Sequence, residues 1–286
     1  MFSPNYCCAV KRSFDNYRYA SGAGEPRARA AQSMTSSGII HPKSESLTAI
    51  ESVITSKDLD VAFQPIVDLT DGSMFSAEAL VRCKVPQFRL PTVLFEHAVA
   101  NNYCGRLGRA IREVTFSRCG SLPVFVNIHP IELSEPWLVR PDDPIFSHDN
   151  DVYLEITESV PFSHYSLCVT VLREVRLRGQ LHLVIDDLGS GFSSLKRISD
   201  LQPRVVKIDM GLVAGLDRNP RQQKLIESIV QLCINLGADV VAEGIETIDE
   251  LKAVIDTGAH YGQGFLLARP AYPVPAINWP LKGGGG

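Results

Sequence analysis

The sequence of 286 residues lacks several features that would place the protein in a membrane, in an oxidising compartment or on nucleic acid. No apolar run reaches the ~20 residues that a membrane-spanning helix needs, and the polar, basic stretch 1–19 has no secretory core. The seven cysteines form no zinc-type spacing, and their odd number argues against a disulfide framework. The net charge of −4 provides no basic surplus for a phosphate backbone. We therefore expect a cytoplasmic globular protein without a membrane span or a nucleic-acid polymer as partner.

Two kinds of catalytic signature are also missing. No Ser–His or Cys–His pair stands out as a nucleophile with its base, which argues against a covalent intermediate. No Gly-rich dinucleotide-binding loop follows any of the expected strands. The seven histidines are scattered, and we interpret His129 as a structural residue.

Composition divides the chain into three parts. Hydrophobic residues make up 45% of the sequence, which is sufficient for a sizeable core. Residues 1–43 are rich in Ser, Ala, Gly and Arg without periodicity, which predicts a mobile arm. A folded domain is expected over 44–275, opening with a short amphipathic helix from Ser44 to Lys57. The remaining segment, 276–286, ends in four glycines and is expected to be a flexible tail.

Strand-like and helix-like segments alternate within the domain. The expected strands are Val61–Leu69, Met74–Val81, Val124–Ile128, Asp151–Ile156, Leu181–Ile185, Val205–Ile208, Val240–Ala242 and a short one before Gln263. The expected helices are Thr92–Asn101, Arg106–Arg118, Ser163–Arg178, Phe192–Ile198, Pro220–Leu236 and one that opens with a capping box at Thr247–Glu250. In the helix from Pro220, one apolar stripe contains Leu225, Ile229, Leu232 and Leu236.

Repeated strand–helix units predict a mostly parallel sheet with helices outside it. Eight strands in about 220 residues fit an α/β fold of the closed (β/α)8, TIM-like barrel type. Asp71-Gly72 is a hairpin signal between the first two strands, so one antiparallel strand is expected. A doubly wound open sheet is the alternative fold.

The stretch around which the chain is organised begins with the apolar run Leu183–Ile185 and ends on Asp186 and Asp187. A Gly-Ser-Gly turn follows at 189–191. Two carboxylates at the end of a buried strand are costly unless a cation meets them, and hard divalent cations prefer carboxylate oxygens. The alternative is that one acid caps a helix and the other is a surface acid.

Polar residues also stand at the ends of the other strands. The full set is Glu78, Asn127, Glu155, Asp186, Asp187, Lys207, Asp209, Glu243 and Gln263. In a barrel, the carboxyl ends of the parallel strands open on one face and share one pocket. A solvated surface does not explain polar groups that interrupt apolar runs at successive strand ends, so a common site is expected.

The residue types indicate metal-assisted phosphoryl chemistry. Oxygens of Glu78, Asn127, Glu155 and Asp186 suit one Mg²⁺ or Mn²⁺, and Asp187 suits a second ion that Asp186 would bridge. Two ions about 4 Å apart clamp the attacking and leaving oxygens of a phosphoryl displacement.

Three further side chains have expected roles in this chemistry. Lys207 would orient the attacking water or neutralise developing charge, and Glu243 would act as the general base. Arg82 would pair with a substrate phosphate through two parallel hydrogen bonds.

The ordered motifs of the chain identify a family that they resemble. They are Phe63-Gln64-Pro65-Ile66-Val67, Glu78-Ala79-Leu80-Val81-Arg82, Val126-Asn127, Glu155-Ile156-Thr157-Glu158-Ser159, Asp186-Asp187-Leu188-Gly189-Ser190-Gly191, Lys207-Ile208-Asp209, Ala242-Glu243-Gly244-Ile245-Glu246 and Gln263-Gly264-Phe265. From about Leu59 to Pro270 the sequence resembles the EAL-domain family, the bacterial cyclic di-GMP phosphodiesterases. The resemblance implies a barrel with one antiparallel strand. It also implies hydrolysis of cyclic di-GMP to linear pGpG with Mg²⁺ or Mn²⁺.

The resemblance also implies roles for individual residues. It makes Glu78, Asn127, Glu155, Asp186 and Asp187 metal ligands, Lys207 the water-orienting lysine and Glu243 the base. The implied substrate contacts are Gln64, Arg82, Asp209 and Gln263. Glu158 and Glu246 are implied to hold the loop that follows the fifth strand. That loop, Leu188–Ser193, often mediates dimerisation in the family, so a homodimer is expected.

The chain departs from the family pattern at three places without losing an implied ligand. Leu188 replaces the usual Phe, Cys83-Lys84 replaces a frequent Trp, and Ala98-Val99 replaces an Ala-Glu pair. A catalytically silent cyclic di-GMP receptor and a protein-interaction scaffold are the alternatives to an active enzyme. No cyclase or sensor domain fits in the first 45 residues, so regulation is expected through the arm, the dimer surface or a regulatory protein partner.

Overall fold

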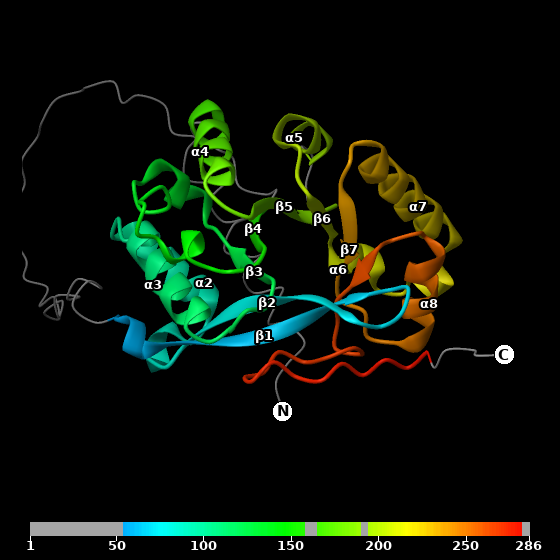
Figure 1. Ribbon diagram of the computed structural model, residues 1–286. Helices are drawn as coiled ribbons and strands as arrows, with labels where there is room; N and C mark the ends of the chain where they lie inside the picture. The colour runs from blue at the N-terminus through cyan, green and yellow to red at the C-terminus, as the bar shows by residue number, and fades with distance from the viewer. Residues whose placement is uncertain (1–53, 158–164, 190–193, 282–286) are drawn as a thin grey trace, which may run out of the picture.

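The computed structural model describes residues 54–157, 165–189 and 194–281. Its centre is a closed barrel in which eight strands follow one another in chain order, from β1 to β8 (Figure 1). The strands are β1 Leu59–Asp68, β2 Met74–Cys83, β3 Val124–Asn127, β4 Val152–Thr157, β5 Leu181–Leu188, β6 Val205–Ile208, β7 Asp239–Ala242 and β8 Tyr261–Gly262. The closed barrel confirms the predicted fold class and excludes the open sheet.

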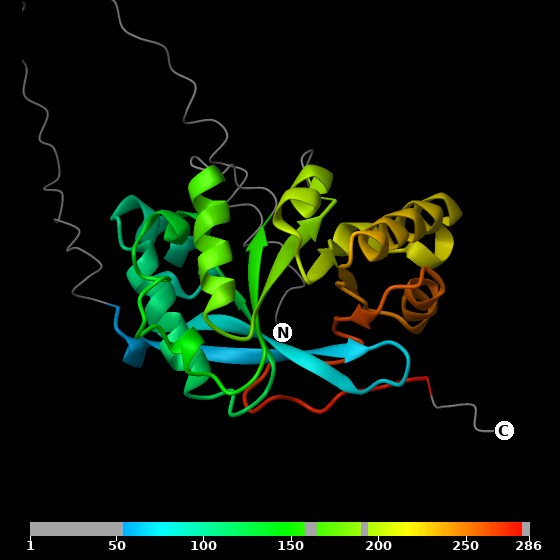
Figure 2. The ribbon, with the colours of Figure 1, turned by 45° about the horizontal axis from the view of Figure 1, so that its top comes forward.

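The α-helices lie outside the barrel, and the views in Figures 1 and 2 agree on this. They are α2 Pro91–Ala100, α3 Cys104–Phe116, α4 Tyr165–Leu177, α5 Ser194–Leu201, α6 Met210–Val213, α7 Pro220–Asn235 and α8 Ile248–Asp256. Short 3₁₀ turns are η3 Ser56–Asp58, η4 Pro86–Phe88, η5 Pro130–Ser134, η6 Pro144–Phe146 and η7 Leu216–Arg218. Within the described residues, no helix is long and apolar enough to cross a membrane.

One strand runs against the others, as the hairpin signal predicted. β1 pairs antiparallel with both β2 and β8, whereas the other neighbouring strands pair in parallel. Gly72 forms the hairpin turn with a left-handed φ of 79°. A Cβ atom there would lie 2.4 Å from the indole of Trp279, so the turn needs glycine for two reasons.

Eight apolar or aromatic side chains, one from each strand, form a single cluster inside the barrel. We call them the apolar ring: Ile66, Phe75, Phe125, Tyr153, Val184, Val205, Val241 and Tyr261. Four of its members form two stacked aromatic pairs. The aromatic centroids of Phe75 and Tyr261 are 3.8 Å apart, and those of Phe125 and Tyr153 are 4.3 Å apart. The ring fills the interior on the side where the parallel strands begin.

A β-bulge in β2 sets which side chains of that strand enter the barrel. Ser76 pairs with Ile66 and Met74 pairs with Val67, so Phe75 is an extra residue without a partner in the ladder. Because side chains alternate along a regular strand, residues 75 and 78 would otherwise point to opposite faces. The bulge allows Phe75 to join the apolar ring while Glu78 also faces inward.

The predicted apolar stripe of α7 is not the stripe that faces the core. The buried side chains are Ile226, Val230 and Cys233, whereas Leu225 is 50% exposed and Leu236 is 43% exposed. The helix carries two apolar stripes offset by one residue, and periodicity alone does not choose between them. The packing of α7 against β7 determines that the stripe of Ile226, Val230 and Cys233 is the buried one.

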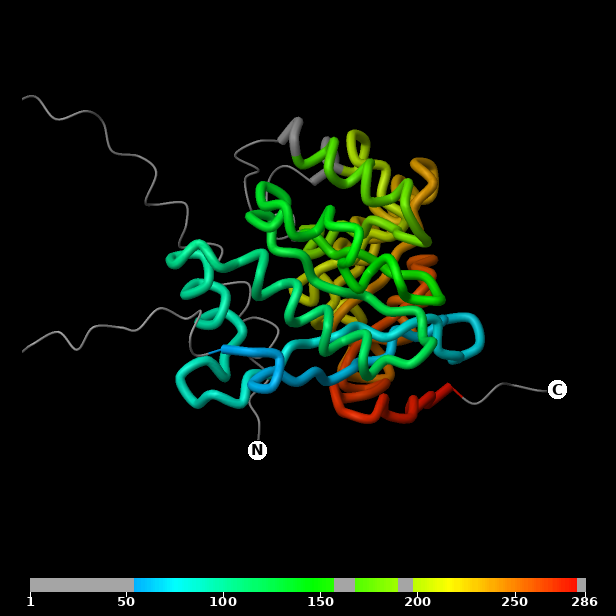
Figure 3. Tube along the Cα trace, turned by 60° about the vertical axis from the view of Figure 1, so that its left-hand side comes forward, coloured from blue at the N-terminus to red at the C-terminus, as the bar shows by residue number. Residues whose placement is uncertain are grey.

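Both ends of the described chain differ in detail from the expectation. The helix predicted to end at Lys57 is not α-helical there, because a 3₁₀ turn covers Ser56–Asp58, and 44–53 lie outside the described residues. At the other end, the backbone N–H of Asn278 donates to Leu267 O at 2.7 Å, and Trp279 covers Gly72. Residues up to Leu281 therefore run along the β1–β2 hairpin (Figure 3), although a flexible tail was expected from 276.

Candidate metal and active site

A second set of eight side chains, one in or directly after each strand, lies beyond the apolar ring toward the carboxyl ends of the parallel strands. We call it the polar ring: Gln64, Glu78, Asn127, Glu155, Asp186, Lys207, Glu243 and Gln263. From β3 to β8, each member stands two residues after the apolar-ring residue of its strand, which is the period of a β-strand. The structure thus brings together the residues that the sequence placed at separate strand ends.

Lys207 lies at the centre of the polar ring and is fully buried. Its Nζ atom is 2.7 Å from Glu155 Oε1, 2.8 Å from Glu243 Oε1, 3.2 Å from Glu78 Oε2 and 3.6 Å from Asp186 Oδ1. Burial alone would lower the pKa of Lys207, but these four carboxylates outweigh burial and raise the pKa well above its usual value. The ammonium group therefore stays charged and cannot serve as a base.

Four carboxylates share this one buried ammonium group, so negative charge is in surplus. Burial, followed by the charge of Glu78, raises the pKa of Glu155 well above its usual value. Burial raises the pKa of Glu78. The charge of Lys207 and hydrogen bonds from Gln263 and Asn127 lower this pKa by a larger amount, so the net shift is downward. A cation with oxygen preference would offset the surplus.

The donor atoms of the site fit a hard divalent cation. Within the described part of the chain, Glu155 Oε2 and Gln263 Oε1 are buried without a hydrogen-bond partner. Buried polar atoms normally have partners, so unpaired oxygens in an acidic site indicate a missing ligand of positive charge. Carboxylate and amide oxygens are the ligands that Mg²⁺, Mn²⁺ and Ca²⁺ prefer.

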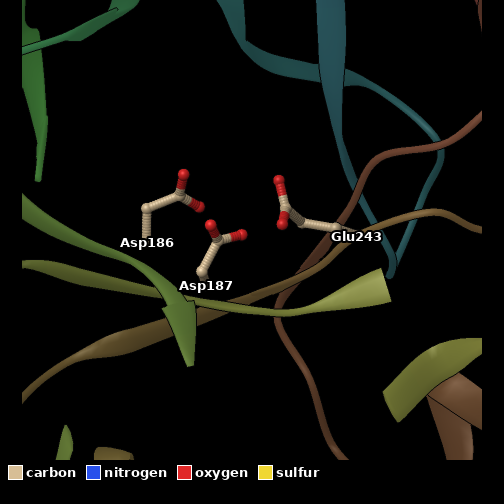
Figure 4. A group of neighbouring side chains, drawn as sticks. All are labelled: Asp186, Asp187 and Glu243. Carbon is tan, nitrogen blue, oxygen red and sulfur yellow. The ribbon is translucent and has the colours of Figure 1, made fainter. Parts of the chain in front are cut away.

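A second acidic cluster shares Asp186 and Glu243 with the group around Lys207 and adds Asp187. Oxygens of Asp186, Asp187 and Glu243 all lie within 4.8 Å of one another, and Figure 4 shows the three carboxylates directed toward a common point. Asp187 adopts a left-handed φ of 63°, and the β5–β6 register shifts between Ile185 and Leu188. Successive strand residues normally point to opposite faces, so this bulge is what brings adjacent carboxylates to one side.

The two glutamines of the polar ring are buried and form a hydrogen-bond chain that ends on Glu78. Gln64 Nε2 donates to Ala268 O at 3.0 Å, and Gln263 Nε2 donates to Gln64 Oε1 at 3.2 Å and to Glu78 Oε2 at 2.8 Å. Asn127 Nδ2 donates to the other carboxylate oxygen of Glu78 at 3.2 Å. These contacts fix the orientation of the Glu78 carboxylate.

Arg82 and Asp209 lie at strand ends beside the polar ring. The Arg82 guanidinium donates to Val81 O at 2.9 Å and is half-buried. Asp209 caps α6 by accepting a hydrogen bond from the Gly211 N–H at 2.7 Å. Their contacts with a substrate stay a prediction.

Two acids, Glu158 and Glu246, were expected to hold the loop after the fifth strand. Glu158 lies outside the described residues, and the side chain of Glu246 is exposed. The buried acid near Glu246 is Glu250. Its carboxylate accepts backbone hydrogen bonds from Glu246 and Thr247, both at 3.1 Å, and from Gly215 at 2.9 Å. The capping-box pattern pointed to the contact with Thr247, but no local pattern indicates the contact with Gly215, which comes from the preceding unit.

Comparison with known proteins agrees with this architecture. Residues 47–270 match the family model described as EAL domain. The chain belongs to the EAL domain family. As a member of that family, it has the closed mixed barrel described above.

The related proteins are longer than this EAL-domain chain. It is 28% identical over 247 residues to the cyclic di-GMP phosphodiesterase PA2567 of Pseudomonas aeruginosa, covering 82% of this chain and 42% of the relative. It is also 28% identical over 226 residues to the cyclic di-GMP phosphodiesterase RocR of the same organism, covering 74% of this chain and 57% of RocR. The chain therefore spans about half the length of these relatives.

Two solved structures have a similar fold. The manganese and cyclic di-GMP complex of Klebsiella pneumoniae BlrP1 aligns with a TM-score of 0.66 at 28% identity, covering 75% of this chain and 56% of that one. A calcium and cyclic di-GMP complex of BlrP1 aligns with a TM-score of 0.67 at 27% identity, covering 77% of this chain and 58% of that one. BlrP1, a structural relative of this EAL domain, thus forms complexes that hold a divalent metal ion and cyclic di-GMP.

Two of the departures from the family pattern are accommodated in the core of this EAL domain. Leu188 and Cys83 are buried and belong to the main hydrophobic cluster, whereas Val99 is half-buried and Lys84 is exposed. Burial also raises the pKa of the Cys83 thiol, so that cysteine is a packing residue and not a nucleophile.

Proposed function

We propose that this EAL-domain protein hydrolyses one phosphodiester bond of cyclic di-GMP to give linear pGpG, with two Mg²⁺ or Mn²⁺ ions as cofactors. The observation that carries the proposal is the buried Lys207, which lies among four carboxylates, two of which, Asp186 and Glu243, also cluster with Asp187. The names of the relatives and the contents of the BlrP1 complexes support the choice of substrate and metal.

The proposed metal ligands divide into two groups. Glu78, Asn127, Glu155 and Asp186 would hold one ion, and Asp187 would hold the second with Asp186 shared between them. When bound, the ions supply Lewis-acid stabilisation of phosphoryl charge and lower the pKa of water near the phosphorus.

The protein's own groups provide the proton transfer and part of the charge stabilisation. Glu243 would accept the proton of the attacking water as its oxygen forms a bond to phosphorus. The phosphorus–oxygen bond to one ribose then breaks, and the leaving oxygen takes up a proton to become a hydroxyl group. Lys207, held 2.8 Å from Glu243, would orient the attacking water or neutralise charge on the phosphoryl oxygens.

Four further residues are proposed to act on the substrate, two by direct contact and two through Glu78. Arg82 and Asp209 would contact the dinucleotide where the strands end, with the guanidinium group on a phosphate. Gln64 and Gln263 are buried in the chain of hydrogen bonds on Glu78, so we propose that they act on substrate mainly by orienting that carboxylate. We further propose a homodimer, as the resemblance implies, together with a regulatory protein partner and a cytoplasmic location.

The decisive experiment is to incubate the purified protein with cyclic di-GMP and Mn²⁺ and to look for pGpG by chromatography. Formation of pGpG that depends on the metal supports the proposal. Tight binding of cyclic di-GMP without pGpG in either Mg²⁺ or Mn²⁺ would show a silent receptor instead. Absence of any binding would leave only the scaffold alternative.

A further inference from the structure

The connection between β3 and β4 contains no α-helix, although all of its residues, 128–151, are described. It contains only the short turns η5 and η6, and it begins directly after Asn127. An irregular connection lacks the regular hydrogen bonds that pair the backbone N–H groups of a helix. Side chains therefore provide acceptors for some of these N–H groups.

A buried ionic network, which we call the Arg112 network, joins both turns to α3. Arg112 Nη1 is 2.7 Å from Glu132 Oε2 of η5, and Arg112 Nη2 is 2.8 Å from Asp143 Oδ2, which caps η6. All three side chains are at most 1% exposed. Figure 1 shows α3 at the side of the barrel near the start of β3 and β4.

Each carboxylate of the Arg112 network also accepts a backbone hydrogen bond from its own turn. Glu132 Oε1 accepts from the N–H of His129 at 3.1 Å, and Asp143 Oδ1 accepts from the N–H of Ile145 at 3.2 Å. The two acids are alike in burial and share one cation, which donates to Glu132 through Nη1 and to Asp143 through Nε and Nη2. They differ in which part of the connection they hold.

Stability alone is a weak reason to keep such a network. Removing ions from water costs several kcal/mol each, and apolar replacements of buried ion pairs are often neutral or stabilising. Burial raises the pKa of Glu132, and Arg112 offsets only part of that shift. A role in fixing backbone position accounts for the network better than a net stabilising contribution does.

Glu132 acts close to a proposed metal ligand. The His129 N–H that it binds is two residues after Asn127, and the intervening Ile128 N–H donates to Glu155 O at 2.9 Å. Asn127 is exposed, whereas the other polar-ring members are buried, so packing around its side chain contributes little to its position. Its placement depends on its hydrogen bond to Glu78 and on the backbone that follows it.

We propose that Glu132 is a positioning residue that holds the backbone at His129 and thereby keeps the Asn127 amide at the metal site. The inference rests on the proposed function, because it takes Asn127 to be a ligand. It assigns no such role to Asp143, whose backbone partner Ile145 lies far along the connection from Asn127.

The test compares Glu132→Gln with Asp143→Asn, a matched pair in which each variant removes one buried charge from the same arginine. Mn²⁺ affinity is measured by titration calorimetry, and thermal unfolding is recorded for both variants. Loss of a supporting partner around a metal ligand typically weakens binding about 10–100-fold. We expect Glu132→Gln to weaken Mn²⁺ binding about tenfold, at the lower end of that range, and Asp143→Asn to change it by less than about twofold.

A second variant moves the Glu132 carboxylate without removing any charge. A Cβ atom at Gly108 of α3 would lie 2.1 Å from Glu132 Oε2 and 2.4 Å from Oε1, so Gly108→Ala must displace that carboxylate. Alanine also favours the helix, which limits any loss of stability. We expect Gly108→Ala to weaken Mn²⁺ binding in the same direction as Glu132→Gln, and this variant decides the test if Glu132→Gln does not fold.

Three outcomes would count against these ideas in different ways. Equal Mn²⁺ affinity in Glu132→Gln and Asp143→Asn would overturn the positioning role and leave the proposed function intact. Wild-type affinity in Gly108→Ala would do the same. If the wild-type protein forms no pGpG and binds no Mn²⁺, the proposed function fails, and the role of Glu132 fails with it.

Discussion

Lys207 Nζ lies 2.8 Å from Glu243 Oε1, although the two residues come from neighbouring strands and are 36 positions apart in the chain. The contact places a permanent positive charge against the proposed base. Neither residue is among the proposed substrate contacts, so proton transfer and substrate binding can be tested separately.

Replacing the proposed base should remove hydrolysis and leave binding. We expect Glu243→Gln to bind cyclic di-GMP in Ca²⁺ with near-native affinity and to hydrolyse it about 10²–10⁴-fold more slowly in Mn²⁺. Calorimetry gives the affinity and single-turnover pGpG formation gives the rate. A variant that hydrolyses at the wild-type rate would show that Glu243 is not the base.

Removing Glu78 should abolish metal-dependent turnover without unfolding the barrel. The carboxylate is a proposed ligand and accepts hydrogen bonds from Asn127 and Gln263 while pairing with Lys207. We expect Glu78→Ala to lower turnover by more than about a hundredfold, with an unchanged circular dichroism spectrum. Wild-type turnover in Mg²⁺ would exclude Glu78 as a ligand.

Asp187 should show separate contributions of its backbone conformation and its charge. Its φ of 63° is left-handed, a region that Asn and Gly adopt readily and that costs other residues about 1–2 kcal/mol. We expect Asp187→Ala to be less stable than Asp187→Asn and Asp187→Gly in urea unfolding. All three variants should lose activity, since each lacks the carboxylate. Equal stability of the alanine and asparagine variants would contradict the argument from strain.

Glu250 should make the stability depend on pH in the acidic range. Burial raises the pKa of its carboxyl group, but backbone hydrogen bonds from Gly215, Glu246 and Thr247 outweigh burial and lower the pKa below 4.5. A carboxyl whose pKa is lower in the folded state stabilises the fold above its unfolded pKa, and this contribution is lost as the pH falls through the folded value. We expect Glu250→Gln to destabilise the protein more at about pH 7 than at about pH 3.

Urea unfolding at the two pH values measures this difference. Lys252→Gln is a suitable control, because Lys252 lies in the same helix and its ion pair with Asp249 is exposed. Its effect should be small at both pH values. An equal loss of stability for Glu250→Gln at both pH values would show that the charge of Glu250 contributes nothing.

Local sequence patterns were sufficient for the strand order and for most members of the site. Strands such as Val205–Ile208 are short apolar runs in which inward-facing residues alternate with outward-facing ones. Lys207 and the other polar residues at strand ends could therefore be placed, from the sequence alone, at the carboxyl end of a barrel. The same alternation fails where the backbone is irregular. It would place Asp186 and Asp187 on opposite faces, and it gives no sign that Phe75 and Glu78 both point inward.

Local patterns are enough to predict the barrel, its one antiparallel strand and the polar residues at the strand ends, because these depend on periods of two and 3.6 residues and on turn signals. Tertiary structure alone decided that Ile226, and not Leu225, faces the core, and that Gln263 contacts Glu78. It also decided that Arg112 meets Glu132 and Asp143. These pairings join segments far apart in the chain. They are selected by the cost of leaving a buried charge or amide without a partner, which no local pattern records.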